Sequence, residues 1–134
     1  DVFDATDGKG GNRMSGGTGN DTFFLGSNDR ALGGNGNDTF IVQIGGNNLI
    51  SGGAGADDFR IVTVELPEAA NNILDFQIGI DTISILGAGG LGISAATLVL
   101  DEIGGNSEII FGTKTLAVLS GVTGLDVNMI NLVN

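Results

Sequence analysis

The chain has 134 residues, with 16 acidic and 5 basic side chains and a formal net charge of −11 at pH 7. It contains no His and no Cys, which excludes an imidazole base, a thiolate nucleophile, a disulfide and the usual Cys/His zinc sites. The negative charge argues against nucleic acid as a partner and favours cations. We expect one domain without enzymatic activity and without a membrane span, because no apolar run approaches the roughly 18 residues required.

Three nearly identical segments occur in the first half of the chain: GGTGNDTFF at 16–24, GGNGNDTFI at 33–41 and GGAGADDFR at 52–60. Each reads GGxGxDx followed by Phe, and weaker copies lie between them. Two such nine-residue units make one period of a repeat. The opening residues 1–3 match the end of a unit, which predicts that the array continues upstream of residue 1.

Residues 71–85 continue the repeat after an insertion at 64–70, which Pro67 marks as a loop. Within one unit, the glycines allow a tight turn whose carbonyl groups are directed to one side. The x-Phe-x triplet that follows is typical of a short strand with one side chain directed inward. Consecutive units then wind into coils about 4.8 Å apart. The predicted fold class is all-β, a solenoid of stacked turns and short strands.

The register of such a solenoid predicts two inner walls. The first wall is a ladder of Phe3, Phe23, Phe40 and Phe59, one from each coil. The opposite wall is formed by Met14, Leu32, Ile50 and Ile73. A buried Phe contributes about 1.5–3 kcal/mol, so we expect the Phe ladder to be the main apolar support of the coils.

The same register predicts a column of aspartates along one edge of the coils, formed by Asp1, Asp21, Asp38 and Asp57. Carboxylates at one-coil spacing repel each other by about 1 kcal/mol in water and by more at a lower dielectric, so the column requires cations. The nearby ligands are carboxylate and carbonyl oxygens, a set that favours Ca²⁺ over Zn²⁺, copper or Mg²⁺. We expect Asp81 to extend this edge, unless the insertion at 64–70 displaces it from register.

The three tandem matches resemble the GGxGxDxUx nonapeptide of the RTX (repeats-in-toxin) family, whose repeats form a calcium-binding parallel β-roll. The resemblance covers residues 1–85 and implies a right-handed parallel β-roll. It implies that 86–134 is a small β-rich C-terminal cap, which also resembles the uncleaved secretion signals of such proteins.

The resemblance further implies at least two Ca²⁺ ions, each held between two successive turns. The ligands in that family are the Asp side chains of both turns and the carbonyls of the first four turn residues. Carried over to this chain, the ligands are Asp21, Asp38 and Asp57 with the carbonyls of Gly16, Gly17, Thr18, Gly19, Gly33, Gly34, Asn35, Gly36, Gly52, Gly53, Ala54 and Gly55.

The opposite edge departs from the family pattern. Asn12, Asn48 and Asn71 take the place of Asp there, and the short unit at 25–32 puts Arg30 near the expected position. An amide can bind a metal through its oxygen but brings no charge. We therefore expect metal sites at this edge, including those at Asn12 and Asn48, to be weaker or empty.

By this resemblance, the chain is a module of an extracellular bacterial protein exported by type I secretion machinery. Low calcium inside the cell would leave the carboxylates repelling each other and the chain open, and calcium outside would convert binding free energy into folding free energy. The implied partners are calcium ions, the secretion machinery and upstream domains of the parent protein, where a catalytic domain can exist. The alternative is a structural or adhesive repeat that binds a surface or ice. Such a repeat requires a regular ladder of Thr or Asn on its turns, whereas the third turn position here changes from Thr18 and Asn35 to Ala54.

Residues 87–92, GAGGLG, match the GxGxxG dinucleotide fingerprint and follow the strand-like TISIL. A βαβ unit requires a helix next, whereas 93–103 reads as a strand that leads to a Gly-Gly-Asn turn at 104–106 and a further strand. We therefore interpret 87–92 as a loop.

The charged residues outside the column have a simpler interpretation. Asp58 is a solvated charge beside the ligand Asp57 rather than its acid/base partner. Arg13, Arg30 and Arg60 are interpreted as scattered surface charge.

Overall fold

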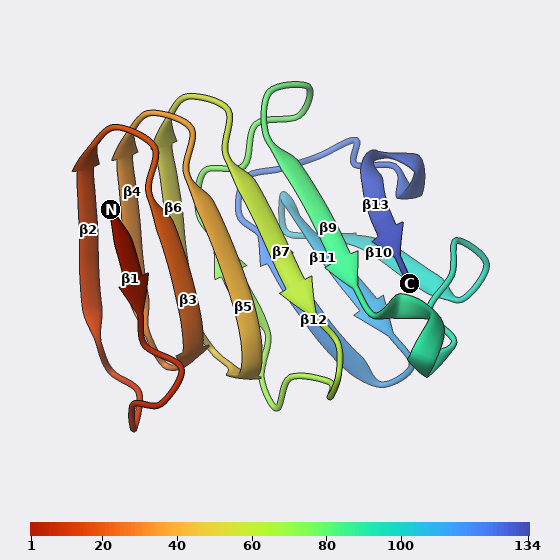
Figure 1. Ribbon diagram of the computed structural model, residues 1–134. Coiled ribbons are helices and arrows are strands. Elements are labelled where there is room, and N and C mark those ends of the chain that lie inside the picture. The colour runs from red at the N-terminus through yellow and green to blue at the C-terminus, as the bar shows by residue number, and fades with distance from the viewer.

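The computed structural model describes the backbone of residues 1–134 and every side chain except that of Ile44. The protein is all-β, and its strands form two facing sheets (Figure 1). The first sheet contains, in spatial order, β1 (Val2–Asp4), β3 (Thr22–Ser27), β5 (Thr39–Gly46), β7 (Asp58–Val62), β9 (Thr82–Leu86) and β13 (Ile130–Val133). The second contains β10 (Leu98–Ile103), β11 (Asn106–Phe111), β12 (Lys114–Leu119), β8 (Asn71–Ile73), β6 (Leu49–Ala54), β4 (Arg30–Asn35) and β2 (Arg13–Thr18).

From β1 to β9 the chain alternates between the two sheets, so odd-numbered strands lie in one and even-numbered strands in the other. Within each sheet, successive strands of this part of the chain pair in parallel. The predicted all-β class and parallel pairing are therefore confirmed. The insertion at 64–70 lies between β7 and β8 and forms no strand, as Pro67 predicts.

The Phe ladder is confirmed by the strand register, which pairs Phe3, Phe23, Phe40 and Phe59 in turn. Their rings stack nearly parallel, with centroids 4.8, 4.8 and 5.1 Å apart. Phe76 adds a fifth ring, tilted by 55° and 5.9 Å from Phe59. The last four members of this series are buried in the core between the sheets.

The opposite inner wall differs from its prediction at one position. The register aligns Met14, Ala31, Ile50 and Ile73. Leu32 points outward instead and is 48% exposed. The unit at 25–32 is one residue short, and a shift of one residue moves a strand side chain to the other face of the sheet. The prediction of Leu32 as a core residue was wrong for this reason.

The C-terminal part of the chain extends both sheets. Strands β10, β11 and β12 form an antiparallel meander, and β12 then pairs in parallel with β8. Strand β13 pairs in parallel with β9. The predicted turn between β10 and β11 is present, with positive φ at Gly104 and Gly105. The core continues into this region through buried side chains that include Ile109, Leu116 and Leu119.

The segment at 87–92 contains the 3₁₀ helix η1 (Ala88–Leu91), and β10 follows it directly in the chain order. The geometry of a βαβ unit is therefore not formed there, which agrees with the interpretation as a loop. A second 3₁₀ helix, η2 (Val127–Met129), precedes β13. None of the described helices has the length and apolar character needed to cross a membrane.

Candidate metal centre

The aspartate column lies where the strands of the second sheet turn into those of the first, and its buried members are Asp21, Asp38, Asp57 and Asp81. The Oδ1 atom of each accepts a hydrogen bond from the main chain of the preceding member. The N–H of Asp21 donates to Asp38 at 2.8 Å, that of Asp38 to Asp57 at 2.9 Å, and that of Asp57 to Asp81 at 2.9 Å. The amino group of Asp1 donates to Asp21 at 2.5 Å. The structure therefore brings the predicted column together and keeps Asp81 in it despite the insertion.

The second carboxylate oxygen of three column members has no partner. Oδ2 of Asp21, Asp38 and Asp57 is buried and accepts no hydrogen bond from the described residues. Buried polar atoms are nearly always hydrogen-bonded, and an unpaired buried charge is costly. A cation bound beside these oxygens would remove that cost.

Each of these oxygens lies against the first glycine of its own turn. The glycine and aspartate pairs are Gly16 with Asp21, Gly33 with Asp38 and Gly52 with Asp57. A Cβ atom on any of the three glycines would collide with Oδ2 of its partner. The carbonyl oxygen of Gly33 lies 2.7 Å from the Cβ position of residue 16, and that of Gly52 lies 2.5 Å from the Cβ position of residue 33. In the first two turns, therefore, a carboxylate oxygen converges with a carbonyl oxygen of the next turn.

The glycines at the second and fourth positions of the turns at 33–38 and 52–57 allow these turns to stack closely on the preceding ones. Gly34 and Gly36 have φ values of 108° and 130°, and a Cβ on either would collide with the carbonyl oxygen of Gly17 or Gly19 in the preceding turn. Gly53 and Gly55 repeat this arrangement one turn later.

The third-position carbonyls join neighbouring turns. The carbonyl of Asn35 accepts from the N–H of Gly19, and that of Ala54 accepts from the N–H of Gly36, each at 2.9 Å. Among the carbonyls predicted as ligands, those of Asn35 and Ala54 thus already accept a main-chain hydrogen bond.

Burial raises the pKa of Asp38 above its ordinary value of 3.8, and the charge of Asp21 acts in the same direction, while the hydrogen bond from the Asp21 N–H lowers it. Burial also raises the pKa of Asp57, where the N–H of Asp38 lowers it and the charges of Asp81, Asp38 and Asp75 raise it. In both cases burial is the largest effect. The ionised forms of these two carboxyl groups are therefore disfavoured in the metal-free fold.

We expect the metal-free chain to become more folded as the pH is lowered. Because the folded-state pKa of Asp38 and Asp57 lies above the unfolded value of 3.8, their contribution to stability is complete below pH 3.8 and is lost as the pH rises through the raised values. Far-UV circular dichroism in a chelator, from neutral pH downward, measures this change. An Asp38→Asn/Asp57→Asn double variant should reduce the pH dependence, and an equal dependence in both proteins would contradict the explanation.

The opposite edge is a hydrogen-bonded ladder in which Asp29, not Arg30, stands between Asn12 and Asn48. Oδ1 of Asp29 accepts from the main-chain and side-chain N–H groups of Asn12 at 3.0 and 2.9 Å, and its Oδ2 accepts from the N–H of Gly26 at 3.1 Å. Arg30 does lie near this position, but the preceding residue Asp29 occupies it. The Asn-Asp pair at 28–29, which repeats those at 20–21 and 37–38, was the available signal.

The amide groups of this ladder bind to the protein itself. Asn48 is fully buried, its Oδ1 accepts from the N–H of Asp29 at 2.9 Å, and its Nδ2 donates to Gly26 O at 2.8 Å and Asn71 Oδ1 at 2.9 Å. The Nδ2 of Asn71 donates to the carbonyl of Leu116 at 3.2 Å. The unpartnered carboxylate oxygens described above all lie at the other edge.

Asp75 is a functional candidate that the sequence did not reveal. The register of β6 and β8 places it beside Gly52, where the next turn would have its first glycine. Its Oδ1 accepts from the N–H of Gly52 at 2.8 Å, and its Oδ2 accepts from the N–H of Gly53 at 2.9 Å and the hydroxyl of Ser51 at 2.7 Å. Asp75 therefore holds the turn at 52–57 with a carboxylate instead of a stacked glycine.

The candidate ligands form a column, with one carboxylate per turn, rather than a compact cluster. Within the described part of the chain, no group of three or more His, Cys, Asp or Glu side chains is arranged to hold a metal ion. Any cation at this edge therefore depends on backbone carbonyls as well as on carboxylates.

No protein-family model matches the sequence, and no curated protein matches it.

Proposed function

We propose that this chain is a calcium-responsive folding module, in which Ca²⁺ ions bind inside the stacked turns of a parallel β-roll and hold its coils together. The observation that carries the proposal is the set of three buried Oδ2 atoms, on Asp21, Asp38 and Asp57, that have no hydrogen-bond partner among the described residues. Ca²⁺ takes six to eight oxygen ligands in a flexible geometry. A column of carboxylates with backbone carbonyls between them suits that requirement.

The first proposed site lies between the turns at 16–21 and 33–38, and the second lies between those at 33–38 and 52–57. The oxygens that support the first are Asp21 Oδ2 and the carbonyl of Gly33, and those that support the second are Asp38 Oδ2 and the carbonyl of Gly52. Because Asp38 stands between the two sites, we assign it to both. Bound calcium would neutralise the column and connect adjacent turns.

The RTX-like repeats extend this proposal to secretion. A chain with a net charge of −11 and a column of stacked carboxylates would be unstable where calcium is scarce and would fold where calcium is plentiful. Such a module suits a bacterial protein that type I machinery exports unfolded. In that role the strands after residue 86 cover the last coil, and the folded array assists folding of the domains upstream.

The proposal predicts that the isolated chain is largely unfolded in EGTA and becomes β-rich in millimolar calcium. Folding without a cation leaves the buried Oδ2 atoms of the column unpaired among the described residues, so the cation supplies stability that the metal-free fold lacks. Far-UV circular dichroism during a calcium titration measures the transition, and a parallel titration with Mg²⁺ serves as the control because Mg²⁺ requires a smaller, rigid octahedral site. A fully folded spectrum in EGTA that calcium leaves unchanged would overturn the proposal.

A further inference from the structure

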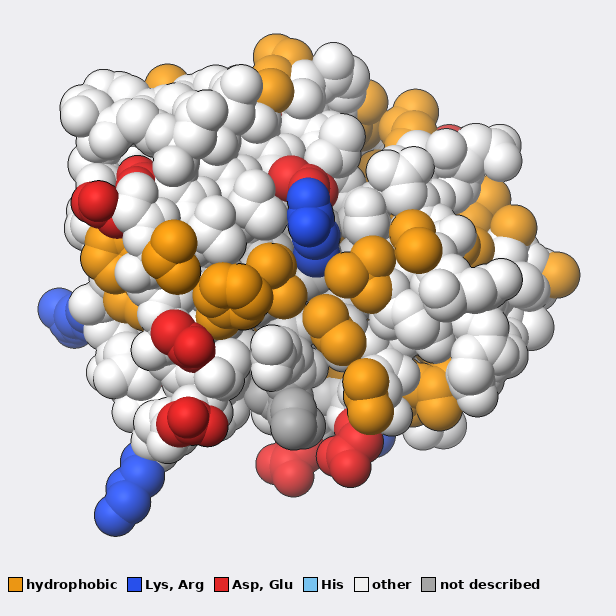
Figure 2. Space-filling model, in the orientation of Figure 1, with side chains coloured by type: hydrophobic (Ala, Val, Ile, Leu, Met, Phe, Trp, Pro, Cys, Tyr) orange, Lys and Arg blue, Asp and Glu red, His pale blue; other side chains and the backbone are white. Residues whose placement is uncertain are grey.

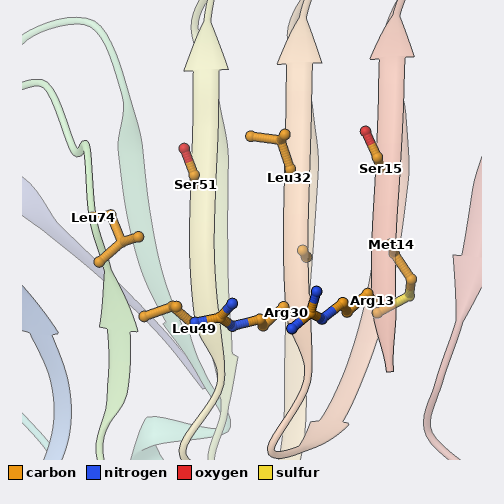
Figure 3. Close-up of a pocket in the computed structure, with 9 residues that line it drawn as sticks. Arg13, Met14, Ser15, Arg30, Leu32, Leu49, Ser51 and Leu74 are labelled. Carbon is orange, nitrogen blue, oxygen red and sulfur yellow. The ribbon is translucent and has the colours of Figure 1, made fainter. Parts of the chain in front are cut away.

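The outer face of the second sheet carries an open groove of about 350 Å³ that crosses β2, β4 and β6. Arg13, Arg30 and Leu49 are register partners on these three strands and form one side of it. In Figure 3 both arginine side chains extend in the same direction, from β2 toward Leu49. The second row of the groove contains Leu32, and Leu74 lies at its end beyond β6.

The two arginines form an uncompensated positive pair in an acidic protein. They are two of only 5 basic side chains in a chain with a net charge of −11. On the first sheet, whose outer face mixes apolar, acidic and basic side chains (Figure 2), Arg60 pairs with Asp58 at 2.6 Å. The ion pairs found among the described residues include neither Arg13 nor Arg30. The interpretation of these two as scattered charge was therefore wrong, because the parallel register sets them side by side.

Apart from Ser15 and Ser51, which flank Leu32, the remainder of the groove is apolar although it faces outward. Leu32 is 48% exposed and Leu74 is 44% exposed, and Leu49, in the row of the arginines, is half-buried. The outward face of a sheet that is open to water normally carries polar side chains. The two positive charges and the apolar strip beside them suit a partner that carries both a negative charge and an apolar part.

The groove also has a direction. At its β6 end, the hydroxyl of Ser51 donates to the carboxylate of Asp75 at 2.7 Å. A negative charge therefore lies beside the β6 end, whereas the positive charges of Arg13 and Arg30 lie over β2 and β4. An anionic group would be repelled from Asp75 and attracted to the arginine pair, with its apolar part directed along the leucines.

We propose that this groove binds a small amphipathic anion, with one acidic headgroup on Arg13 and Arg30 and an alkyl chain over Leu32, Leu49 and Leu74. Guanidinium groups bind carboxylate, sulfate and phosphate oxygens through paired, charge-assisted hydrogen bonds. The headgroup compensates the two adjacent cations, and the chain removes exposed leucine surface from water. This site shares no residue with the proposed calcium ligands.

Octyl sulfate is the probe, used below its micelle concentration on the full chain in a buffer where circular dichroism shows the folded state. Isothermal titration calorimetry should show saturable binding. Methyl sulfate, which keeps the headgroup and lacks the chain, should bind at least tenfold more weakly, and octylammonium, which reverses the charge, should not bind. Absence of saturable octyl sulfate binding, or equal binding of octylammonium, would overturn the proposal.

Variants locate the site. An Arg13→Gln/Arg30→Gln double variant should weaken octyl sulfate binding at least tenfold, and Leu32→Ser should weaken it several-fold. Arg60→Gln is the matched control, because it also removes a positive charge but lies on the other sheet, and it should bind as the wild type does. The substituted side chains are exposed or half-exposed, and an unchanged calcium titration of each variant separates this test from that of the calcium proposal. Equal affinity of the wild type and the double variant would overturn the assignment.

Discussion

Replacement of Asp38 by Asn is expected to weaken calcium-induced stabilisation at least tenfold in apparent affinity, equivalent to about 1.4 kcal/mol. Asp38→Asn keeps an Oδ1 acceptor for the N–H of Asp21 but removes the charge beside the unpartnered oxygen. Because Asp38 is assigned to both sites, Asp57→Asn should have a smaller effect. Calcium titrations followed by circular dichroism, with melting curves in calcium and in EGTA, measure the difference.

The matched control for this series is Asp58→Asn. Asp58 carries the same charge, but it pairs with Arg60 at the surface and belongs to no proposed site. Its calcium midpoint should therefore match that of the wild type. In EGTA, Asp38→Asn should be no less stable than the wild type, because it removes a buried negative charge. Identical calcium midpoints for the three variants would show that the column acts only through general charge.

Removal of residues 87–134 is expected to abolish cooperative folding even in saturating calcium. The deletion takes away β12, which pairs with β8, and β13, which pairs with β9. It thereby exposes Ile73, Ile83 and Ile85, which are buried in the full chain. Each buried side chain of this size contributes about 1.5–3 kcal/mol, and a domain is stable by only about 5–15 kcal/mol. Circular dichroism and thermal melting of the 1–86 fragment in calcium measure the effect.

Point variants separate the loss of packing by the C-terminal strands from the loss of chain length. Leu119→Ala, on β12, removes a side chain that is fully buried, and it should destabilise the calcium-bound protein by about 2–5 kcal/mol. Val99→Ala, on β10, removes an exposed side chain and should have little effect. If the 1–86 fragment folds with the calcium midpoint of the full chain, residues 86–134 are better interpreted as a separate module.

The aspartate column and the Phe ladder could be predicted because the repeated GGxGxD units fix the register of the turns. Once Asp21 and Asp38 are aligned, Phe23 and Phe40 must align as well, and the structure bears this out. The error at Leu32 and the failure to identify Asp29 have one cause, since both residues belong to the unit that is one residue short. In a strand, a single residue decides which face a side chain occupies.

Other features depend on pairings that local sequence does not encode. The strands between 98 and 119 could be predicted from their apolar patterns and turns, but not the parallel pairing of β12 with β8. Asp75 was missed because its turn has lost the glycines that mark the earlier turns. The adjacency of Arg13 and Arg30, in contrast, could have been predicted, because their spacing is the same 17 residues that separates Asp21 from Asp38.

An anomalous difference map from crystals grown in calcium would show directly whether calcium lies inside the turns. We expect peaks there, each about 2.3–2.6 Å from a carboxylate Oδ2 atom, with one beside Asp21 and one beside Asp38. Carbonyl oxygens of Gly33 and Gly52 should lie in the same ligand spheres. Well-ordered turns at 16–21 and 33–38 without such peaks, or calcium only at the edge that contains Asn48, would contradict the account.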